Sequence, residues 1–411
     1  MKILFLTDEF HPTLGANSLV VRTLAGELVK REHRVFVMPF SYGADLPASE
    51  LWQGIQIVRA VPYDDKRALS ECVKKGKLFT ACKIALKYAK VKCARNEKIL
   101  HKDRIAARGV LERFIKENQI DLVVSICCSV ELSFPLLYLR KKNKLPCKWL
   151  FYMIDPFESH SYYRGIEKVS SLRKLQHEIM KRCDGVLMTG LIYEDTKAWE
   201  TEEILKKITL VEFPKIERPT IEPCEDDVLP NGDKINVVCT GSKNEAVRSS
   251  AYTLRLAEGL KDKPILFHFI GHGWCDTEKE EKGNCVFYKA RSHQAIRNLQ
   301  MKADFLLNIG NVVVNQLPSK VLEYISAGRP IINVAKSKAC PTVPLLENAD
   351  AITVWESDEV EASVAKISDF ISAERKAQSF EEIEKQYELY TPKYVAEQIL
   401  ITNEKQTNID P

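Results

Sequence analysis

Short apolar runs alternate with segments of helical periodicity along almost the whole chain. The expected strands form two series: residues 3–6, 34–38, 55–58, 122–126, 149–154 and 186–189, then 236–239, 266–270, 286–288, 305–308, 331–334 and 352–354. Apolar strands separated by helices are typical of parallel sheets that helices cover on both faces. The pattern predicts an α/β protein with two doubly wound, Rossmann-like parallel-sheet domains.

A proline-rich segment with an acidic cluster, residues 213–234, separates the two series and has the composition of a linker. We therefore expect an N-terminal domain over residues 1–212 and a C-terminal domain over residues 235–390. Residues 391–411 are expected to form a helix that packs back toward the N-terminal domain, and a tail. Ligands bind beyond the carboxyl ends of such sheets, so we expect the two domains to face a cleft.

The composition is that of a soluble globular protein, with 45% hydrophobic and 28% charged residues among 411. The 12 cysteines form no C-x-x-C pair, which favours reduced thiols in a cytosol. The first apolar run ends at Asp8, too early for a signal peptide, and no segment has the pattern of a membrane span. We expect a cytoplasmic protein, free or peripheral at the inner face of the plasma membrane.

Positive charge is concentrated in one segment. Residues 66–116 hold 16 Lys or Arg and four acidic residues, a net charge of +12, whereas the whole chain carries +4 and the remainder therefore −8. Such a segment suits an anionic membrane or an acidic substrate, and a solvated helix face is the alternative. No nucleic-acid-binding motif accompanies it, so nucleic acid is not an expected partner.

Two loops that follow expected strands are candidates for anion binding. The loop after the first strand contains Gly15 and Asn17 and opens a helix, so its free N–H groups suit an anion; an ordinary βα turn is the alternative.

The richest segment is NQLPSKVLEYISAGRP, residues 315–330. Its helix begins at Pro318, and the first turn, with Ser319, Lys320 and Val321, suits a pyrophosphate. Glu323, an acceptor only, suits a ribose diol; an ordinary surface helix is the alternative.

Residues 315–330 resemble the donor-site signature of family 4 retaining glycosyltransferases of the GT-B fold, in the subgroup with the motif P-S-K-x-x-E-Y. The resemblance covers nearly the whole chain, since the opening strand and loop, LAGEL at 24–28, KRCDGVLMT at 181–189 and YTPKYVA at 390–396 match the same family. It implies metal-independent transfer of a hexosyl or N-acetylhexosaminyl group from a UDP- or GDP-linked sugar, with no cofactor. A lipid-linked or polysaccharide acceptor in cell-envelope, capsular or exopolysaccharide synthesis is expected.

The resemblance also implies roles for residues of the signature. Glu323 would bind the ribose, and Lys320 would lie beside the diphosphate. Family members usually carry a second Glu eight positions earlier, near the sugar hydroxyls, and this chain has Asn315 there. Asparagine hydrogen-bonds hydroxyl groups without a charge, so the donor sugar stays open.

A further segment, Gly241-Ser242-Lys243, follows the expected strand 236–239. The family commonly has Gly-Arg here and a Lys six residues beyond the Arg. This chain has Ser242 at the Arg position and Arg248 at the Lys position. The leaving nucleoside diphosphate needs fixed positive donors, so Arg248 is expected to be the main clamp, with Lys243 beside it.

Three residues are candidates for the acceptor side. Asp155 and His160 follow the expected strand 149–154, where Asp155 would orient a hydroxyl group and His160 would shuttle a proton. Glu131, after the preceding strand, is the third, and helix capping or turn formation is the alternative for each. No metal-ligand spacing is present, so no metal is expected. An epimerase or hydrolase of the same fold, or a non-catalytic nucleotide-sugar-binding protein, are the competing functions.

Overall fold

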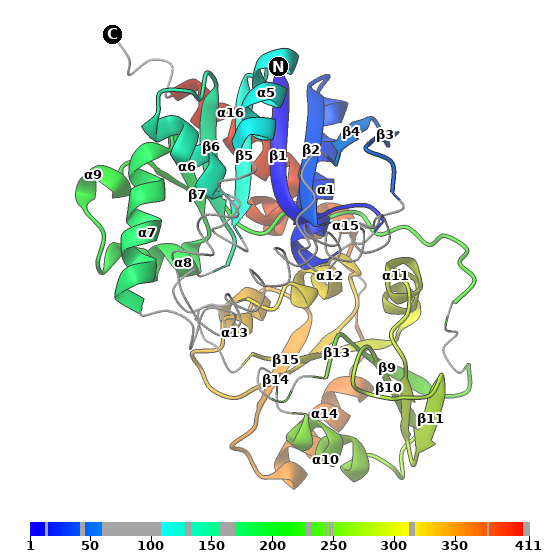
Figure 1. The fold of residues 1–411 in the computed structure, drawn as a ribbon. Coiled ribbons are helices and arrows are strands. Elements are labelled where there is room, and N and C mark those ends of the chain that lie inside the picture. Colours follow the sequence, from blue (N-terminus) through cyan, green and yellow to red (C-terminus); the bar gives the residue numbers. More distant parts are fainter. Residues whose placement is uncertain are drawn as a thin grey trace, which may run out of the picture. The chain divides into compact units, whose positions relative to one another are not determined.

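The computed structural model describes residues 1–12, 15–41, 46–59, 108–127, 133–155, 169–226, 228, 232–243, 245, 248, 250–311, 317–375 and 378–405. The chain divides into two compact units, each a sheet with helices on both faces (Figure 1). The first unit comprises Met1–Pro214 and Pro392–Pro411, and the second comprises Lys215–Thr391.

The sheet of the first unit has the strand order β3-β4-β2-β1-β5-β6-β7-β8. All neighbouring strands are parallel except β3, which pairs antiparallel with β4 at the edge. The order reverses between β1 and β5, as in a doubly wound sheet. The strands are β1 (Lys2–Glu9), β2 (Arg34–Ser41), β3 (Ser49–Trp52), β4 (Ile55–Val58), β5 (Leu122–Cys127), β6 (Lys148–Met153), β7 (Gly185–Met188) and β8 (Ile208–Leu210).

Helices cover both faces of this sheet. The described helices are α1 (Ala16–Lys30), α5 (Arg108–Asn118), α6 (Phe134–Lys141), α7 (Val169–Arg182), α8 (Gly190–Lys197), α9 (Glu202–Leu205) and α16 (Pro392–Lys405). α1 and the C-terminal helix α16 pack together on one face, and α5, α6 and α7 lie on the other (Figure 1). The last described helix of the chain therefore completes the first unit.

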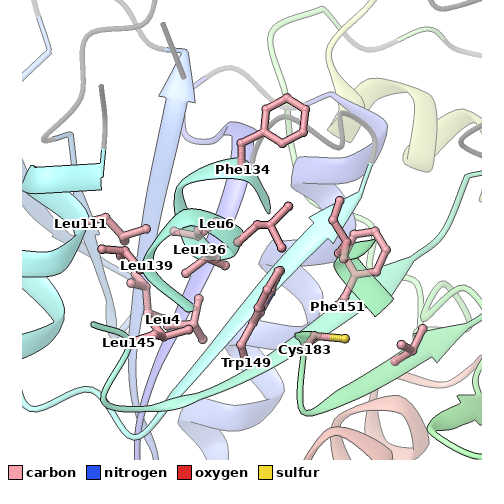
Figure 2. Close-up of a cluster of buried hydrophobic side chains, with 14 of the residues drawn as sticks. Leu4, Leu6, Leu111, Phe134, Leu136, Leu139, Leu145, Trp149, Phe151 and Cys183 are labelled. Atoms are coloured by element: carbon pink, nitrogen blue, oxygen red, sulfur yellow. The ribbon is translucent and has the colours of Figure 1, made fainter. Parts of the chain in front are cut away.

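The alternation of side chains along β1 explains why both faces need cover. Leu4 and Leu6 point into the cluster formed with α5 and α6, where Trp149 of β6 is also fully buried (Figure 2). Ile3 and Phe5 alternate with them and are equally buried. Each buried side chain of this size contributes about 2 kcal/mol relative to exposure, so an uncovered face would be costly.

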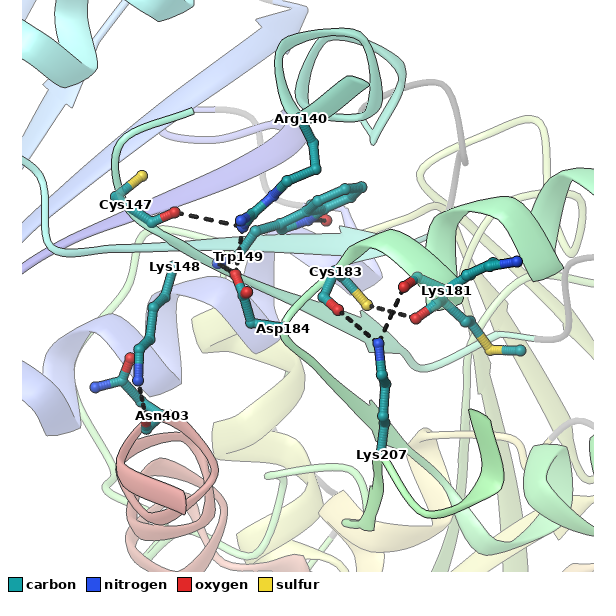
Figure 3. Close-up of polar contacts among 11 residues, drawn as sticks. Arg140, Cys147, Lys148, Trp149, Lys181, Cys183, Asp184, Lys207 and Asn403 are labelled. Atoms are coloured by element: carbon teal, nitrogen blue, oxygen red, sulfur yellow. Dashed lines mark hydrogen bonds and ion pairs between the residues drawn. The ribbon is translucent and has the colours of Figure 1, made fainter. Parts of the chain in front are cut away.

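Polar contacts fasten the amino-terminal edge of this sheet (Figure 3). The Asp184 carboxylate accepts a hydrogen bond from the backbone N–H of Trp149 at 2.7 Å and forms an ion pair with Arg140. The Lys148 ammonium donates to the carbonyl oxygen of Asn403 at 2.7 Å, which ties α16 to β6. Lys207 donates to the carbonyl oxygen of Lys181 at 3.0 Å, at the end of α7.

The sheet of the second unit has the order β11-β12-β10-β9-β13-β14-β15, with only β11 antiparallel to its neighbour. The order reverses between β9 and β13. Its strands are β9 (Ile235–Thr240), β10 (Ile265–Ile270), β11 (Lys279–Lys282), β12 (Cys285–Tyr288), β13 (Phe305–Ile309), β14 (Ile331–Ala335) and β15 (Ala351–Trp355). The described helices are α10 (Ala251–Gly259), α11 (His293–Lys302), α12 (Lys320–Ser326), α13 (Thr342–Leu346), α14 (Val360–Ser372), α15 (Phe380–Gln386) and the 3₁₀ helix η2 (Glu388–Tyr390).

The two faces of the second sheet differ in character. The face under α10 and α14 is apolar, with Phe267, Phe269 and Leu307 in its cluster. The face that contacts α11, α12 and α13 carries buried polar side chains, among them Thr240 and Asn308. Buried polar groups need partners, so this second face is where a hydrogen-bonded site is built.

The predicted fold class, two doubly wound α/β units, is confirmed. The apolar runs do not predict β3 and β11, the two antiparallel edge strands, or β8, the parallel strand at the other edge of the first sheet. β11 has the sequence KEEK, and all four of its residues are exposed. A charged edge strand of this kind keeps a sheet from pairing with other chains. In the part of the chain that the structure describes, no helix is both long enough and apolar enough to span a bilayer.

His268 of β10 is buried within this second sheet. Its Nε2 lies 2.9 Å from Oδ1 of Asn236, and its Nδ1 lies 3.3 Å from the hydroxyl oxygen of Tyr288. Burial, with a smaller effect of the Lys279 charge, lowers the pKa of His268 to about 4. The imidazole is therefore neutral in the folded protein, whereas in the unfolded chain it gains a proton below pH 6.5.

We expect His268 to make the protein sensitive to acid. Because the folded pKa lies below the unfolded one, stability falls as the pH drops from about 6.5 to about 4, by on the order of 3 kcal/mol. In His268→Gln, the shift of the urea unfolding midpoint between pH 7 and pH 5 should be smaller than in the wild type. The control is His272→Gln, at an exposed position, and an equal pH shift in both variants would contradict the assignment.

Candidate functional site

The candidate site lies beyond the carboxyl end of β9, where the strand order of the second sheet reverses. β9 is buried up to Thr240, and Gly241 follows with φ +122°, a value that side-chain-bearing residues rarely adopt. In doubly wound sheets this reversal point is where ligands bind, because the loops on either side diverge.

The loop after β9 is shaped by close backbone contacts. A Cβ atom on Gly271, after the neighbouring β10, would clash with the carbonyl oxygen of Gly241. The same carbonyl accepts a hydrogen bond from the indole Nε1 of Trp274 at 2.8 Å, and the Trp274 ring lies 4.7 Å from that of Phe269. Glycine at 271 therefore allows two loops to meet, and Trp274 fixes them.

The positive charges expected in this loop are brought together. Arg248 donates from Nε to Oδ1 of Asn311, after β13, at 2.8 Å, so its guanidinium spans the reversal point. The Lys243 ammonium lies 5.6 Å from the centre of the Trp274 ring. Among the described residues, one pocket is lined by Cys239, Thr240, Gly241, Ser242, Lys243, Arg248, Ser250, Trp274, Leu307, Asn308, Ile309 and Tyr324.

Tyr324 joins α12 to the end of β9. Its hydroxyl oxygen accepts from the backbone N–H of Thr240 at 2.7 Å, and it lies 3.0 Å from Oγ1 and 3.3 Å from the carbonyl oxygen of the same residue. Gln300 of α11 also donates to Oγ1 of Thr240, at 3.1 Å. Burial raises the pKa of Tyr324, so the hydroxyl keeps its proton and can both donate and accept.

Glu323, next to Tyr324 in α12, is a buried carboxylate with 4% of its surface exposed. Its Oε2 lies 2.7 Å from the ammonium of Lys320, and its Oε1 lies 3.9 Å from the ammonium of Lys215. Burial alone raises the pKa of Glu323, but the charges of these two lysines, the hydrogen bond from Lys320 and a smaller effect of His293 outweigh it and lower the pKa to about 2. Glu323 is therefore ionised at neutral pH and acts only as an acceptor.

The other residues of the P-S-K segment serve the start of α12. Ser319 is the N-cap residue and is half-buried, and its side chain makes no capping hydrogen bond. Val321 is fully buried, and its N–H donates to the carbonyl oxygen of Pro318 at 3.1 Å. Asn315 lies outside the described residues. The pocket beyond β9 includes Tyr324 in its lining but neither Glu323 nor Lys320.

The remaining candidates belong to the first unit. Gly15 is the N-cap residue of α1, and a side chain there would clash with the carboxylate of Glu9. Asn17 is half-buried in the first turn of the same helix. Asp155 follows β6 and is partly exposed. Glu131 and His160 lie outside the described residues.

Several residues of the site have no signal in the sequence motifs. Lys215 lies in a segment with the composition of a linker, yet it reaches Glu323. The loops of the pocket are held by hydrogen bonds of Thr240, Asn311 and Trp274. In the sequence, these three residues are distinguished only by their positions after expected strands. Among the described residues, no group of three or more His, Cys, Asp or Glu side chains could hold a metal ion.

Comparison with known proteins identifies the fold. The second unit has the strand order of a nucleotide-binding sheet, with cations at its reversal point, and the first unit is wound in the same way. No family model matches the sequence, and no curated protein does.

Solved structures of glycosyltransferases are similar in fold over the whole chain. Sucrose-phosphate synthase from Thermosynechococcus elongatus has a TM-score of 0.64 at 13% identity and covers 100% of both chains. The lipopolysaccharide outer core galactosyltransferase WaaB, in its apo form, has a TM-score of 0.58 at 16% identity over 99% of this chain and 100% of that chain. WaaG, a glycosyltransferase involved in lipopolysaccharide biosynthesis, has a TM-score of 0.53 at 14% identity over 96% and 99%. The chain therefore has the two-domain GT-B fold of these enzymes.

Proposed function

We propose that the protein is a glycosyltransferase that takes a sugar from a nucleotide-diphosphate sugar, UDP- or GDP-linked. The observation that carries this proposal is Glu323, a buried, ionised carboxylate one residue from Tyr324, which lines the cationic pocket beyond β9. Such a carboxylate suits the two hydroxyl groups of a ribose, which donate to it. The solved structures of similar fold, which include a sucrose-phosphate synthase and a galactosyltransferase, support the same chemistry.

The positive groups of the site are proposed to bind the diphosphate. Arg248 is held at the strand reversal by Asn311, and Lys243 lies in the same pocket. A guanidinium held by a hydrogen bond is pre-organised to stabilise the charge that develops on the leaving diphosphate. Lys320 has 26% of its side chain exposed and would turn from Glu323 toward the diphosphate when the nucleotide binds. With these cations at the diphosphate, we propose a metal-independent transfer, and the resemblance of residues 315–330 to retaining glycosyltransferases favours retention of configuration.

The acceptor side is proposed for the first unit. Asp155, at the end of β6, would orient a hydroxyl group of the acceptor, with His160 and Glu131 as further candidates. The acceptor would be lipid-linked or a polysaccharide, in cell-envelope, capsular or exopolysaccharide synthesis. The lipopolysaccharide pathways named for WaaB and WaaG and the +12 charge of residues 66–116 favour this class.

Removal of the Glu323 charge should weaken nucleotide binding. Glu323→Gln keeps the side-chain shape but removes the charged acceptor for the ribose hydroxyl groups, so we expect at least a tenfold loss of affinity, about 1.4 kcal/mol, for UDP or GDP. The measurement is calorimetric titration with each nucleotide, with circular dichroism to check the fold. Glu347→Gln, at an exposed site in the same unit, is the control, and wild-type affinity in Glu323→Gln would remove Glu323 from the site.

The same assay distinguishes the competing functions. A panel of UDP- and GDP-sugars is incubated with and without a lipid-linked acceptor, and the release of nucleoside diphosphate is measured. Release that depends on the acceptor supports transfer. Epimerisation or release without an acceptor would instead indicate an epimerase or hydrolase, and binding without turnover a non-catalytic protein.

Arg248 should act on the diphosphate and not on the nucleoside. In Arg248→Met we expect the affinity for UDP or GDP to fall by about tenfold or more, since a hydrogen bond to a charged group is lost. The affinity for the matching nucleoside, uridine or guanosine, should stay within about twofold. Competition titrations with both ligands give the two values, and equal losses for both would contradict a diphosphate clamp.

The basic segment is proposed to hold the protein at an anionic membrane surface. Reversal of four of its charges, Lys74, Lys75, Lys83 and Lys87 to Glu, should weaken sedimentation with phosphatidylglycerol vesicles by about tenfold or more, because each lysine near such a surface contributes about 1 kcal/mol. The matched control reverses exposed lysines of the second unit, Lys261, Lys263, Lys336 and Lys338. Equal sedimentation of both variants would refute the membrane contact, and vesicles of phosphatidylcholine alone give the uncharged baseline.

A further inference from the structure

Lys215 is a buried lysine whose place is fixed by its own backbone. Its N–H donates to the carbonyl oxygen of Tyr390 at 2.9 Å, and its carbonyl oxygen accepts from the Ser326 hydroxyl at 3.2 Å. Only 6% of the side chain is exposed, and the ammonium faces Oε1 of Glu323. A charged lysine removed from water needs a nearby anion, and burial of such an ion pair adds little to folding stability. A functional role for the pair would explain its presence.

The two lysines around Glu323 differ in their freedom to move. Lys320 is one turn away on the same helix, contacts Oε2 at 2.7 Å and has 26% of its side chain exposed. Lys215 contacts the other oxygen from a separate segment and is nearly inaccessible to water. Lys320 can therefore turn to a ligand in solution, whereas Lys215 stays beside the carboxylate.

We propose that Lys215 is the permanent counter-ion of Glu323, a positioning residue that keeps this carboxylate ionised while Lys320 turns to the diphosphate of the bound nucleotide. The inference rests on the proposed function, in which Glu323 binds the ribose. It assigns a role to a residue in the segment expected to be a linker.

The charge balance in the bound state explains why a second lysine is needed. When Lys320 turns toward the diphosphate, Glu323 loses its closer cation but remains buried. Lys215 and, to a smaller extent, His293 are the positive groups that still act on it. A buried carboxylate without a counter-ion takes up a proton, and a protonated carboxyl group no longer accepts hydrogen bonds from two hydroxyl groups at full strength. Lys215 prevents this protonation, because its ammonium stays near Oε1.

The pH dependence of nucleotide binding tests the proposal. In the wild type, the affinity for UDP or GDP, whichever binds more tightly, should change by less than about twofold between pH 8 and pH 6 once the ionisation of the free nucleotide phosphate is corrected. In Lys215→Met the corrected affinity should be lowest at pH 8 and rise steeply toward pH 6, by up to about tenfold per pH unit, since Glu323 then takes up a proton when Lys320 turns to the diphosphate. Lys215→Arg should restore the flat profile. Lys336→Met, at an exposed site, is the control.

A flat pH profile in Lys215→Met would overturn the proposal, because a merely structural lysine lowers affinity equally at every pH. If Lys215→Met does not fold, the double variant Lys215→Met/Glu323→Gln removes both charges. Recovery of folding in the double variant supports the pair, and equal unfolding overturns it.

A measurement without nucleotide separates this proposal from the proposed function. The titration of the Glu323 carboxyl carbon is followed by NMR in protein labelled with ¹³C-glutamate, with the signal assigned by its loss in Glu323→Gln. Lys215→Met should shift this titration to higher pH, and an unchanged titration overturns the counter-ion role. If the titration shifts but the wild type binds neither UDP nor GDP, the counter-ion assignment holds and the proposed function fails.

Discussion

The hydroxyl group of Tyr324 is the contact on which the second unit's site depends. α12 is only seven residues long, and a helix of that length is not stable in water without tertiary contacts. The Tyr324 hydroxyl forms hydrogen bonds with the backbone of Thr240, the last residue of β9. These bonds hold the helix against the strand reversal of the sheet. The carboxylate of Glu323 and the pocket beyond β9 are consequently held on one rigid frame, because each is adjacent to this contact.

The second constraint is electrostatic. Burial of Glu323 alone disfavours its charged form, and the two lysines, with a smaller effect of the His293 charge, reverse this effect. An ion pair of this kind adds little to folding stability, since the loss of hydration offsets much of the attraction between the charges. Its presence beside Tyr324, which lines the pocket at the strand reversal, is easier to explain by ligand binding than by stability, since buried groups with strongly shifted pKa values concentrate at functional sites.

The sequence predicts the fold well and the site in part. Apolar runs mark the buried central strands, because those strands lie between two layers of helices. They do not reveal β3, β8 and β11, whose edge positions do not require buried apolar side chains. The resemblance of residues 315–330 to a donor-site signature points to Glu323, whereas the local pattern alone leaves an ordinary surface helix open. It does not reveal Lys215 or the partner of Tyr324, because these contacts join distant segments; Thr240 and Tyr324 are 84 positions apart. Asn315, Glu131 and His160 lie outside the described residues and stay predictions.

The ion pair between Lys320 and Glu323 relates the sequence motif to the proposed nucleotide binding. The sequence suggests a lysine on the diphosphate and a glutamate on the ribose, whereas the structure pairs the two side chains at 2.7 Å. These two arrangements are compatible if the pair is the resting form of the site, since Lys320 is accessible enough to exchange one anion for another. A lysine already held near Glu323 loses less side-chain freedom on binding than one that is free in solvent, so the resting pair lowers the entropy cost of nucleotide binding. The same exchange would leave Glu323 without a cation if Lys215 were absent, and this explains why a motif with one lysine is found beside a second, buried one.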